Sequence, residues 1–442
     1  MRVVTGRASG SREAMSREPE SREPARLDRW LAALANWPAV AWLRRGPWDA
    51  LVFTAFTVDV VAYMIITGLP MHRLWTQCAV FGYAAAAIAL WLGHLRWPAR
   101  LGTMRAFAVG AAIVGAILVP IIVESAHGMA DPEIPILVDA AHRLLHTGTP
   151  FPSFTGLGDV NANDYNVYLP VMALFGVPGA LSPGHWFTDP RLFLAIVSFG
   201  LFALFASRGG TTRHGAGYWA ALFLICPWVA VQFGAGATDV PVIGALCLGL
   251  VLAGGGKQVG RPLSAGVAIG LAAGAKALAW PAIPVLLILV FARRGWRSVV
   301  GFLAVVSGTL LVVLGLPALV DPKAFVVNAI QLPLGMLPAR LSATSPLPGH
   351  LLADAGSVGH AIDLALLASV AIALVVGMLR HPPRDYVSAA RWLALGLLAA
   401  ILLAPSSRWG YLIYPGSLLL LPVFTGAFRW PTTKSALADD AL

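Results

Sequence analysis

The chain has 442 residues, of which 58% are hydrophobic and only 12% are charged. Soluble domains carry about a quarter charged residues, and from Leu51 onward this chain contains repeated apolar stretches of the roughly 20 residues needed to cross a bilayer. This composition excludes a soluble enzyme, a nucleic-acid-binding protein and a disulfide scaffold. It predicts an all-α fold, a polytopic transmembrane helical bundle.

The charge pattern predicts how the chain is oriented in the membrane. The formal net charge is +10, and Lys and Arg are retained in cytoplasmic loops during insertion. Three arginines lie within 94–105, so we expect that loop and the N-terminus in the cytoplasm. The next loop, about 124–165, has six acidic residues against the single Arg143 and is expected to be external.

The apolar stretches predict about twelve spans, with both termini in the cytoplasm. Segment 166–181 is expected to enter the membrane without crossing it, because a crossing there would move the later basic loops outside. The predicted organisation is a disordered or interfacial segment 1–48, a transmembrane catalytic domain 49–428 with long external loops at about 124–165 and 321–358, and a cytoplasmic tail 429–442. Spans are predicted near 51–69, 76–95, 105–124, 191–207, 216–234, 238–253, 298–318, 359–379, 389–404 and 410–427, with two short helices within 263–292.

The first external loop carries the strongest candidate for chemistry. Asp131 and Glu133 follow a membrane exit, and apolar residues then recur at helical spacing over 136–145. Gly148 is expected to end this helix, which would lie flat on the outer membrane surface. A carboxylate beside hydrocarbon is a stronger base because desolvation raises its pKa. The alternative is that both acids only stabilise the helix start.

Other polar residues are candidates for binding. Lys276 is the only charged residue between Arg261 and Arg293, and ionisable residues inside apolar segments indicate function by default. It could bind an anion such as a lipid phosphate, or it could snorkel or pair with a structural acid. Arg340, Arg408 and His350 could complete a phosphate clamp, although isolated external arginines are usually solvated anchors. Asn163, Asp164, Tyr165, Tyr168 and Asp239 are candidates for binding sugar hydroxyls, although Asn, Asp and Tyr residues at this density are also ordinary turn formers.

Several motifs together resemble a known enzyme superfamily. The acid pair, the helix ending Leu-Leu-His-Thr-Gly-Thr-Pro-Phe and the following Tyr-Asn-Val-Tyr-Leu-Pro resemble the first external loop of the glycosyltransferase C superfamily, especially its bacterial family 87 polyprenyl-phosphate-mannose-dependent enzymes. The run Gly266–Lys276 before Pro281, and Arg408-Trp-Gly-Tyr with Tyr414-Pro415, look like two later family segments. The similarity covers roughly residues 105–427.

The resemblance implies a function, a location and a set of catalytic residues. The protein would transfer mannose or a related sugar, with inversion, from a polyprenyl phosphate to an envelope lipid or glycan on the outer face of a bacterial plasma membrane. Glu133 is the favoured base, followed by Asp131 and then Asp139. Lys276, Arg340 and Arg408 would stabilise the phosphate leaving group, and no metal or other cofactor is expected. The oligomeric state is left open.

Two other functional classes fit parts of the same pattern. Broken helices and an intramembrane Lys and Asp also occur in transporters and lipid flippases. Transporters usually carry inverted repeats, which this sequence does not show, and the long external loops favour an enzyme. A non-catalytic scaffold for envelope assembly is the third alternative, because the acid position departs from the family pattern.

Overall fold

The computed structural model describes residues 47–153, 165–209, 215–236, 238–255, 261–332, 337 and 345–425. Within these ranges the chain is helical and contains no β-strand, which confirms the predicted all-α class. Residues 49–429 form one compact unit. The predicted cytoplasmic segments at the two ends of the chain lie almost entirely outside the described residues.

Eight helices of the described part are long and apolar enough to cross a membrane. A ninth crossing is possible if the pair α10 (Gly215–Leu224) and α11 (Pro227–Ala235), bent by 57°, counts as one span. Five of the eight are single helices: α3 (Trp48–Ile66), α4 (Pro70–Leu95), α9 (Pro190–Gly209), α19 (Ser357–Arg380) and α20 (Tyr386–Leu403). The other three are composite helices over Pro98–Ala126, Ala277–Arg294 and Trp296–Val320.

Full-length helices therefore do not reach the predicted number of about twelve. Four further apolar stretches are too short to qualify: α8 (Pro170–Leu181), α12 (Asp239–Gly254), α13 (Pro262–Ala275) and η8 with α21 (Trp409–Val423). Hydropathy responds to apolar length and cannot by itself separate a short crossing from a buried core helix. Segment 166–181, predicted not to cross, contains only the 12-residue α8.

Several of the long helices are composite, and short helices connect others. The third long helix consists of η1 (Pro98–Arg100), α5 (Leu101–Ile113), the π-helical η2 (Val114–Leu118) and α6 (Val119–Ala126). The helix over Ala277–Arg294 consists of η5 (Ala277–Ala279) and α14 (Ala282–Arg294). The helix over Trp296–Val320 consists of α15 (Trp296–Leu310), η6 (Leu311–Gly315) and α16 (Leu316–Val320). The connecting helices are η4 (Trp186–Thr188), α17 (Pro322–Val326), η7 (Val327–Gln331), α18 (Pro348–Asp354) and η8 (Trp409–Leu412), which leads into α21 (Ile413–Phe424).

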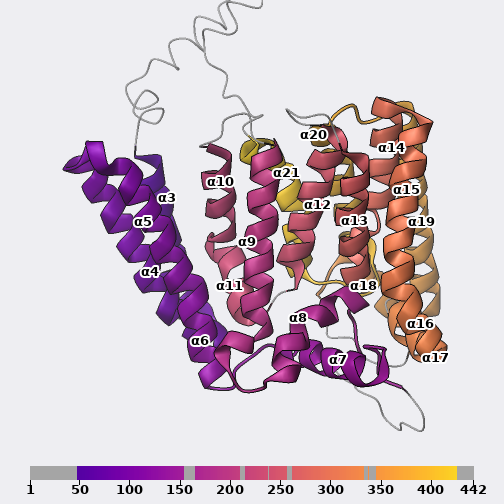
Figure 1. Cartoon of the computed structure of the whole chain (residues 1–442), viewed down its shortest axis with the longest axis horizontal. Helices are drawn as coiled ribbons and strands as arrows, with labels where there is room; N and C mark the ends of the chain where they lie inside the picture. The colour runs from indigo at the N-terminus through magenta and orange to yellow at the C-terminus, as the bar shows by residue number, and fades with distance from the viewer. Residues whose placement is uncertain are drawn as a thin grey trace, which may run out of the picture. The chain divides into compact units, whose positions relative to one another are not determined.

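Helix α12 is the centre of the bundle. All its residues except Leu252 are buried, and it contacts α9, α13, α14, α20 and α21 (Figure 1). A helix that is apolar all round must be covered on every side, by protein or by lipid. Because its neighbours cover it, its first residues, Thr238 and Asp239, are held rigidly at one end of the bundle.

A helix is present where the sequence predicts one, as α7 (Glu133–Thr147). It lies across the lower ends of the long helices in Figure 1 and buries Ile134, Leu137 and the alanines of its apolar face. Gly148 ends the helix in a left-handed conformation, with φ of 79°, which glycine adopts without steric penalty. Glu133 is therefore placed at the first turn of a helix packed onto the bundle.

Helix α7 is seated on α8 through a glycine contact. A Cβ atom at Gly176 would lie 2.1 Å from the backbone oxygen of Leu137, so the two helices approach too closely for any side chain. We expect Gly176→Ala to lower the free energy of unfolding by about 1–3 kcal/mol, because overpacking against backbone forces a helix to move. Gly200→Ala in α9, where a Cβ would meet nothing within 4 Å, is the control. The free energy of unfolding of both variants is measured by equilibrium unfolding in mixed micelles. Equal values for the two variants would contradict this packing.

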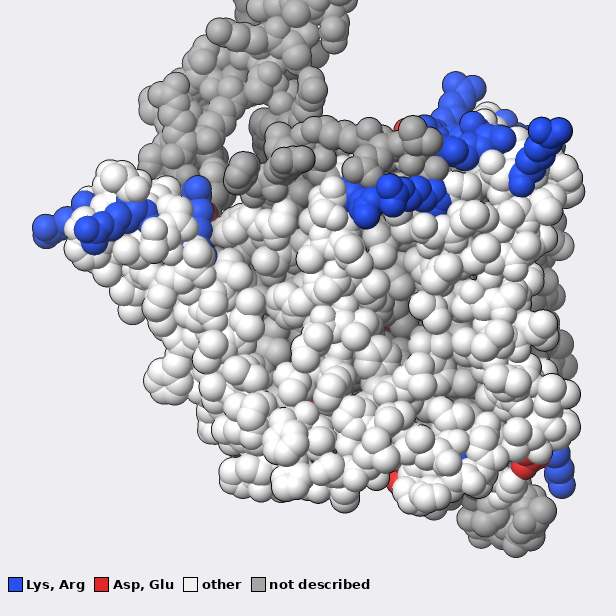
Figure 2. All heavy atoms as spheres, viewed as in Figure 1, with Lys and Arg blue, Asp and Glu red and all other residues white. Residues whose placement is uncertain are grey.

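The charged side chains are distributed unequally between the two ends of the bundle. In Figure 2, Lys and Arg gather along the upper edge, and the lower edge shows few of them. The upper edge in Figure 1 holds the α4–α5 turn, the end of α9 and the ends of α14 and α19. Its arginines include Arg96, Arg100, Arg105, Arg208, Arg293, Arg294, Arg297, Arg380 and Arg384. The charge asymmetry that the sequence predicts is thus present in three dimensions.

Candidate functional site

Five chain segments meet at the end of the bundle that carries α7. They are the start of α7, the start of α12, the break between α13 and η5, the segment before α8, and η8 with the start of α21. Their polar side chains form two linked ion pairs, one centred on Lys276 and the other on Glu133.

Lys276 lies at the break that ends α13. Its backbone is extended, with φ of −146° and ψ of 141°, and the carbonyl of Ala275 accepts a hydrogen bond from the Leu169 N–H at 3.1 Å. The Lys276 ammonium forms an ion pair with Asp239, and both residues are buried, at 7% and 8% exposure. Pairing with an acid, one of the alternatives that the sequence leaves open for Lys276, is therefore present in the structure.

Tyrosines surround this buried pair. The Tyr414 hydroxyl donates to Asp239 Oδ1 at 2.8 Å. The Lys276 Nζ lies 5.2 Å from the ring centroid of Tyr168 and 5.8 Å from that of Tyr411, within the range of cation–π attraction. Asp239 Oδ1 thus accepts from both the Lys276 ammonium and the Tyr414 hydroxyl, and two aromatic rings lie close to the ammonium.

Glu133 forms the second ion pair at the edge of this cluster. Arg408 Nη1 donates to Glu133 Oε1 at 3.1 Å, and the Thr238 hydroxyl donates to Glu133 Oε2 at 3.4 Å. The Tyr168 hydroxyl also hydrogen-bonds with Thr238 and Glu133. Burial and the charge of Glu133 hold the pKa of Tyr168 well above its usual range, so this phenol stays protonated. Because Thr238 precedes Asp239 in the chain, the two ion pairs are mechanically connected.

Asp131 lies beside Glu133 in the loop that leads into α7. Its backbone N–H donates to the Ala235 carbonyl at 3.3 Å, which holds the loop against the end of α11. Burial raises the pKa of the Asp131 carboxyl, and the nearby Arg408 opposes this shift. Arg408 thus acts on both predicted acids: it forms an ion pair with Glu133, and its charge opposes the rise in the pKa of Asp131.

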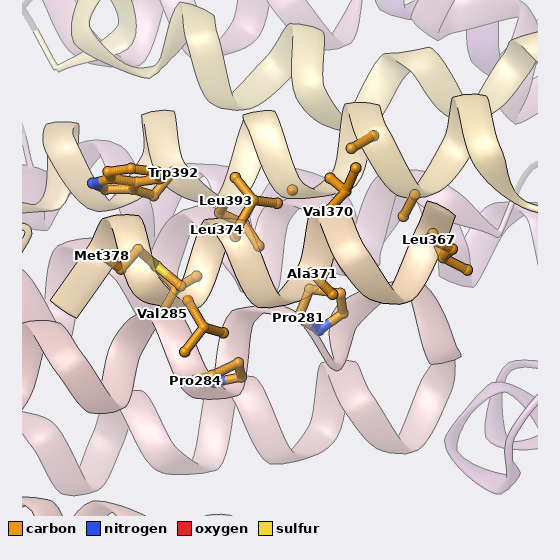
Figure 3. Close-up of a pocket in the computed structure, with 14 residues that line it drawn as sticks. Pro281, Pro284, Val285, Leu367, Val370, Ala371, Leu374, Met378, Trp392 and Leu393 are labelled. Atoms are coloured by element: carbon orange, nitrogen blue, oxygen red, sulfur yellow. The ribbon is translucent and has the colours of Figure 1, made fainter. Parts of the chain in front are cut away.

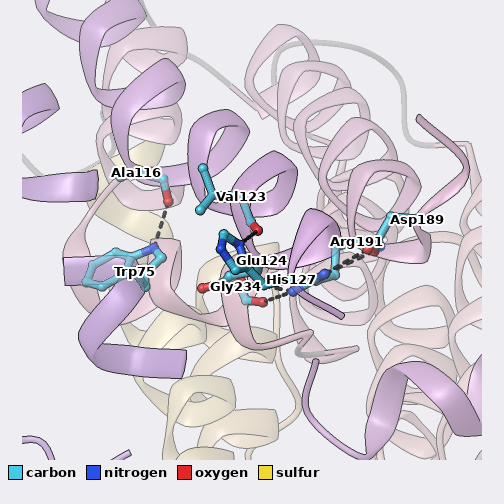
Figure 4. Close-up of polar contacts among 8 residues, drawn as sticks. All are labelled: Trp75, Ala116, Val123, Glu124, His127, Asp189, Arg191 and Gly234. Carbon is cyan, nitrogen blue, oxygen red and sulfur yellow. Dashed lines mark hydrogen bonds and ion pairs between the residues drawn. The ribbon is translucent and has the colours of Figure 1, made fainter. Parts of the chain in front are cut away.

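A buried arginine anchors the same loop from the side (Figure 4). Arg191 is 1% exposed and donates to Glu124 Oε2 at 2.9 Å, to Asp189 Oδ2 at 2.7 Å and to the Gly234 carbonyl at 2.8 Å. These contacts tie the ends of α6 and α11 to the start of α9. Since α6 leads to Asp131 and α11 leads to Thr238, the contacts of Arg191 hold the loop before α7 and the start of α12 at a fixed distance from each other.

The structure does not bring every candidate into this cluster. Asp139 is exposed on α7, and no hydrogen bond or ion pair links it to the cluster among the described residues. His350 has neighbours of its own: its Nδ1 donates to the Pro405 carbonyl at 3.1 Å, and its Nε2 lies 3.4 Å from Asp354 Oδ2. Tyr165 is buried before α8. Arg340, Asn163 and Asp164 lie outside the described residues.

Sequence reasoning missed four residues that the geometry selects. Thr238, Tyr411 and Tyr414 complete the polar network, and Arg191 supports it. Tyr411 and Tyr414 stand in the quoted segment that begins at Arg408, so their proximity to that arginine was an available signal. For Arg191, the available signal was the Asp-Pro-Arg sequence at the start of an apolar span.

Comparison with protein-family models, with curated proteins and with solved structures finds no match to this chain. Among the residues that the structure describes, no group of three His, Cys, Asp or Glu side chains is placed to hold a metal ion. Function is therefore inferred from the chemistry of the site itself.

Proposed function

We propose that this protein is an integral membrane glycosyltransferase, which transfers a sugar such as mannose from a polyprenyl phosphate to an envelope lipid or glycan acceptor. One observation carries the proposal: Glu133, Arg408, Lys276 and Asp239, from four separated parts of the chain, converge with tyrosines at one end of an apolar bundle. Carboxylates, cations and aromatic rings are the groups that activate a hydroxyl, bind a phosphate and contact a sugar face.

The site faces away from the cation-rich edge of the bundle. Arginine-rich ends are retained in the cytoplasm during insertion, which would make the end with α7 external. If α10 with α11, α12, α13 and η8 with α21 each cross, together with the eight long helices, the spans number twelve. Such a count would leave both ends of the described helical unit at the cation-rich edge, as in the predicted topology.

The proposed reaction is a single displacement at the anomeric carbon. Glu133 takes the proton from the acceptor hydroxyl while that oxygen bonds to the anomeric carbon. The bond from this carbon to the phosphate oxygen breaks, and its electron pair leaves with the lipid phosphate. Arg408, whose side chain is 37% exposed, would stabilise the phosphate charge.

The geometry changes the role proposed for Lys276. Its ammonium is buried and neutralised by Asp239, so we assign it to holding the segments together rather than to direct contact with phosphate. Arg408 becomes the principal phosphate-facing cation. We assign different roles to the two cations because the Arg408 side chain is 37% exposed, whereas that of Lys276 is 8% exposed.

An apolar groove offers a place for the lipid tail (Figure 3). It lies between α14, α19 and α20, has a volume of about 260 Å³ and is lined by residues such as Pro281, Leu367 and Trp392. Pro281 is five residues beyond Lys276 in the chain, so one end of the groove begins near the polar cluster. An isoprenoid chain needs such an apolar surface, because it contributes no polar contact of its own.

Transfer of labelled mannose from polyprenyl-phosphate mannose by the purified protein in lipid tests the proposal. We expect wild type to form a glycosylated product whose anomeric configuration is inverted. A membrane extract supplies acceptors, and donor hydrolysis without acceptor is measured separately. Retention of configuration, or no incorporation with any envelope acceptor, would contradict the proposed reaction.

Transport of a lipid or polar solute is a second candidate. Asp363, on the spanning helix α19, has an exposed fraction of 0%, and neither carboxylate oxygen has a hydrogen-bond partner among the described residues. Intramembrane carboxylates of this kind occur in proton-coupled carriers. Movement of a labelled polyprenyl phosphate across proteoliposomes without sugar transfer would favour this candidate.

A further inference from the structure

The end of the bundle opposite the proposed catalytic site contains a second groove. It lies between α14, α15 and α19, with a volume of about 870 Å³, which falls in the range of about 300–1,000 Å³ found for ligand sites. Its walls are apolar and include Leu287, Phe291 and Leu303. Phe291 is 57% exposed and Leu303 is 42% exposed, so the groove opens sideways, where acyl chains lie in a bilayer.

Two arginines stand at the mouth of this groove. Arg293, in the last turn of α14, and Arg384, in the segment between α19 and α20, both line it. Arg293 Nη1 donates to the Arg384 carbonyl at 2.7 Å, which joins the two sides of the mouth. Trp296 also lines the groove and is 67% exposed, as is common for Trp at a membrane–water interface.

The positive charge at the mouth is not balanced by the described part of the protein. No ion pair joins Arg293 or Arg384 to a carboxylate within the described ranges. Asp385, the nearest acid in sequence, caps α20 by accepting the Ser388 N–H at 2.7 Å. Arg294, Arg297 and Arg380 lie on the adjoining helix ends, and Figure 2 shows this corner of the upper edge as a patch of Lys and Arg.

We propose that this groove binds an anionic diacyl phospholipid, with its acyl chains against α14, α15 and α19 and its phosphate between Arg293 and Arg384. Basic pockets between membrane helices bind anionic headgroups, and the cytoplasmic leaflet supplies such lipids. The occupant differs from the sugar donor, whose proposed phosphate site lies at the other end of the bundle. The inference is therefore independent of the proposed enzymatic activity.

Native mass spectrometry of the full chain tests this site with defined lipids. The protein is delipidated in detergent and titrated with phosphatidylglycerol or phosphatidylcholine of identical acyl chains. We expect wild type to retain phosphatidylglycerol preferentially. Because one cation near an anionic lipid changes affinity by roughly fivefold, Arg293→Gln with Arg384→Gln should weaken phosphatidylglycerol binding by about 20-fold or more.

Three further variants separate this site from general surface charge. Arg96→Gln with Arg100→Gln removes two cations from the same edge, at the turn before α5, and is expected to change binding less than twofold. Arg384→Gln alone preserves the Arg293 side chain and should weaken binding about fivefold. Ala292→Phe fills the groove and leaves the charges in place, so it should also weaken binding.

The proposal is overturned by any of three results. Equal binding of the two lipids by wild type would remove the anionic selectivity. Equal loss in the Arg96/Arg100 and Arg293/Arg384 double variants would assign the effect to the whole edge. Unchanged binding by Ala292→Phe would show that the acyl chains do not occupy the groove. The unfolding temperature of every variant is measured as well, so that misfolding is detected separately from loss of lipid binding.

Discussion

Replacing Lys276 by methionine is expected to lower the free energy of unfolding by about 3–5 kcal/mol, because it leaves the Asp239 carboxylate buried without its cation. Asp239 is 8% exposed, and once the ammonium is gone the Tyr414 hydroxyl is its remaining side-chain hydrogen-bond partner among the described residues. Equilibrium unfolding in mixed micelles measures the change. Lys323→Met, at an exposed lysine of α17, is the matched control and should stay within about 0.5 kcal/mol of wild type.

A double-mutant cycle separates the ion pair from simple loss of packing. Asp239→Asn removes the negative charge but keeps an oxygen that can accept the Tyr414 hydrogen bond. The double variant with Lys276→Met should be less destabilised than the sum of the two single variants, by about 1–3 kcal/mol. Additive losses would show that Lys276 and Asp239 are not energetically coupled, and would contradict the role assigned to the pair.

Local sequence patterns predicted the surface helix well because its determinants are local. The apolar period over 136–145 and the glycine at 148 place α7, whose bounds are Glu133–Thr147. The predicted position of Glu133 at the helix start follows from the same pattern. Hydropathy was less informative for the central helices, because α12 and α13 are too short to be distinguished from buried core helices by apolar length alone.

The pairing of charges could not be predicted from the sequence. Lys276 attracts attention because it is an isolated charge in an apolar run, but its partner Asp239 is 37 residues away in the chain. Glu133 and Arg408 are separated by 275 residues. Such contacts depend on which helix ends meet in the folded bundle, and that is decided by tertiary packing around α12. The role of Arg191 is hidden for the same reason.

Replacing Glu133 by glutamine is expected to reduce sugar transfer by about 10²–10⁴-fold, the range that general-base catalysis contributes. Glutamine keeps one oxygen that can accept from Arg408, and its amide group can donate to the Thr238 hydroxyl oxygen, so the fold and donor binding should be retained. The measurement is the initial rate of labelled mannose transfer at saturating donor, together with the unfolding temperature. Asp139→Asn, at an exposed acid of the same helix, should transfer at the wild-type rate.

Asp131 is the competing base, and single variants of the two acids, measured across pH, distinguish it from Glu133. Burial raises the pKa of the Asp131 carboxyl above its ordinary value of 3.8, with Arg408 opposing the shift. A base acts only when deprotonated, so catalysis by Asp131 would be lost on acidification at a pH above that ordinary value. If Asp131→Asn loses sugar transfer while Glu133→Gln transfers sugar normally and keeps this acid limb, the base is Asp131. Full activity in both variants and in Asp139→Asn would exclude all three predicted acids as the base.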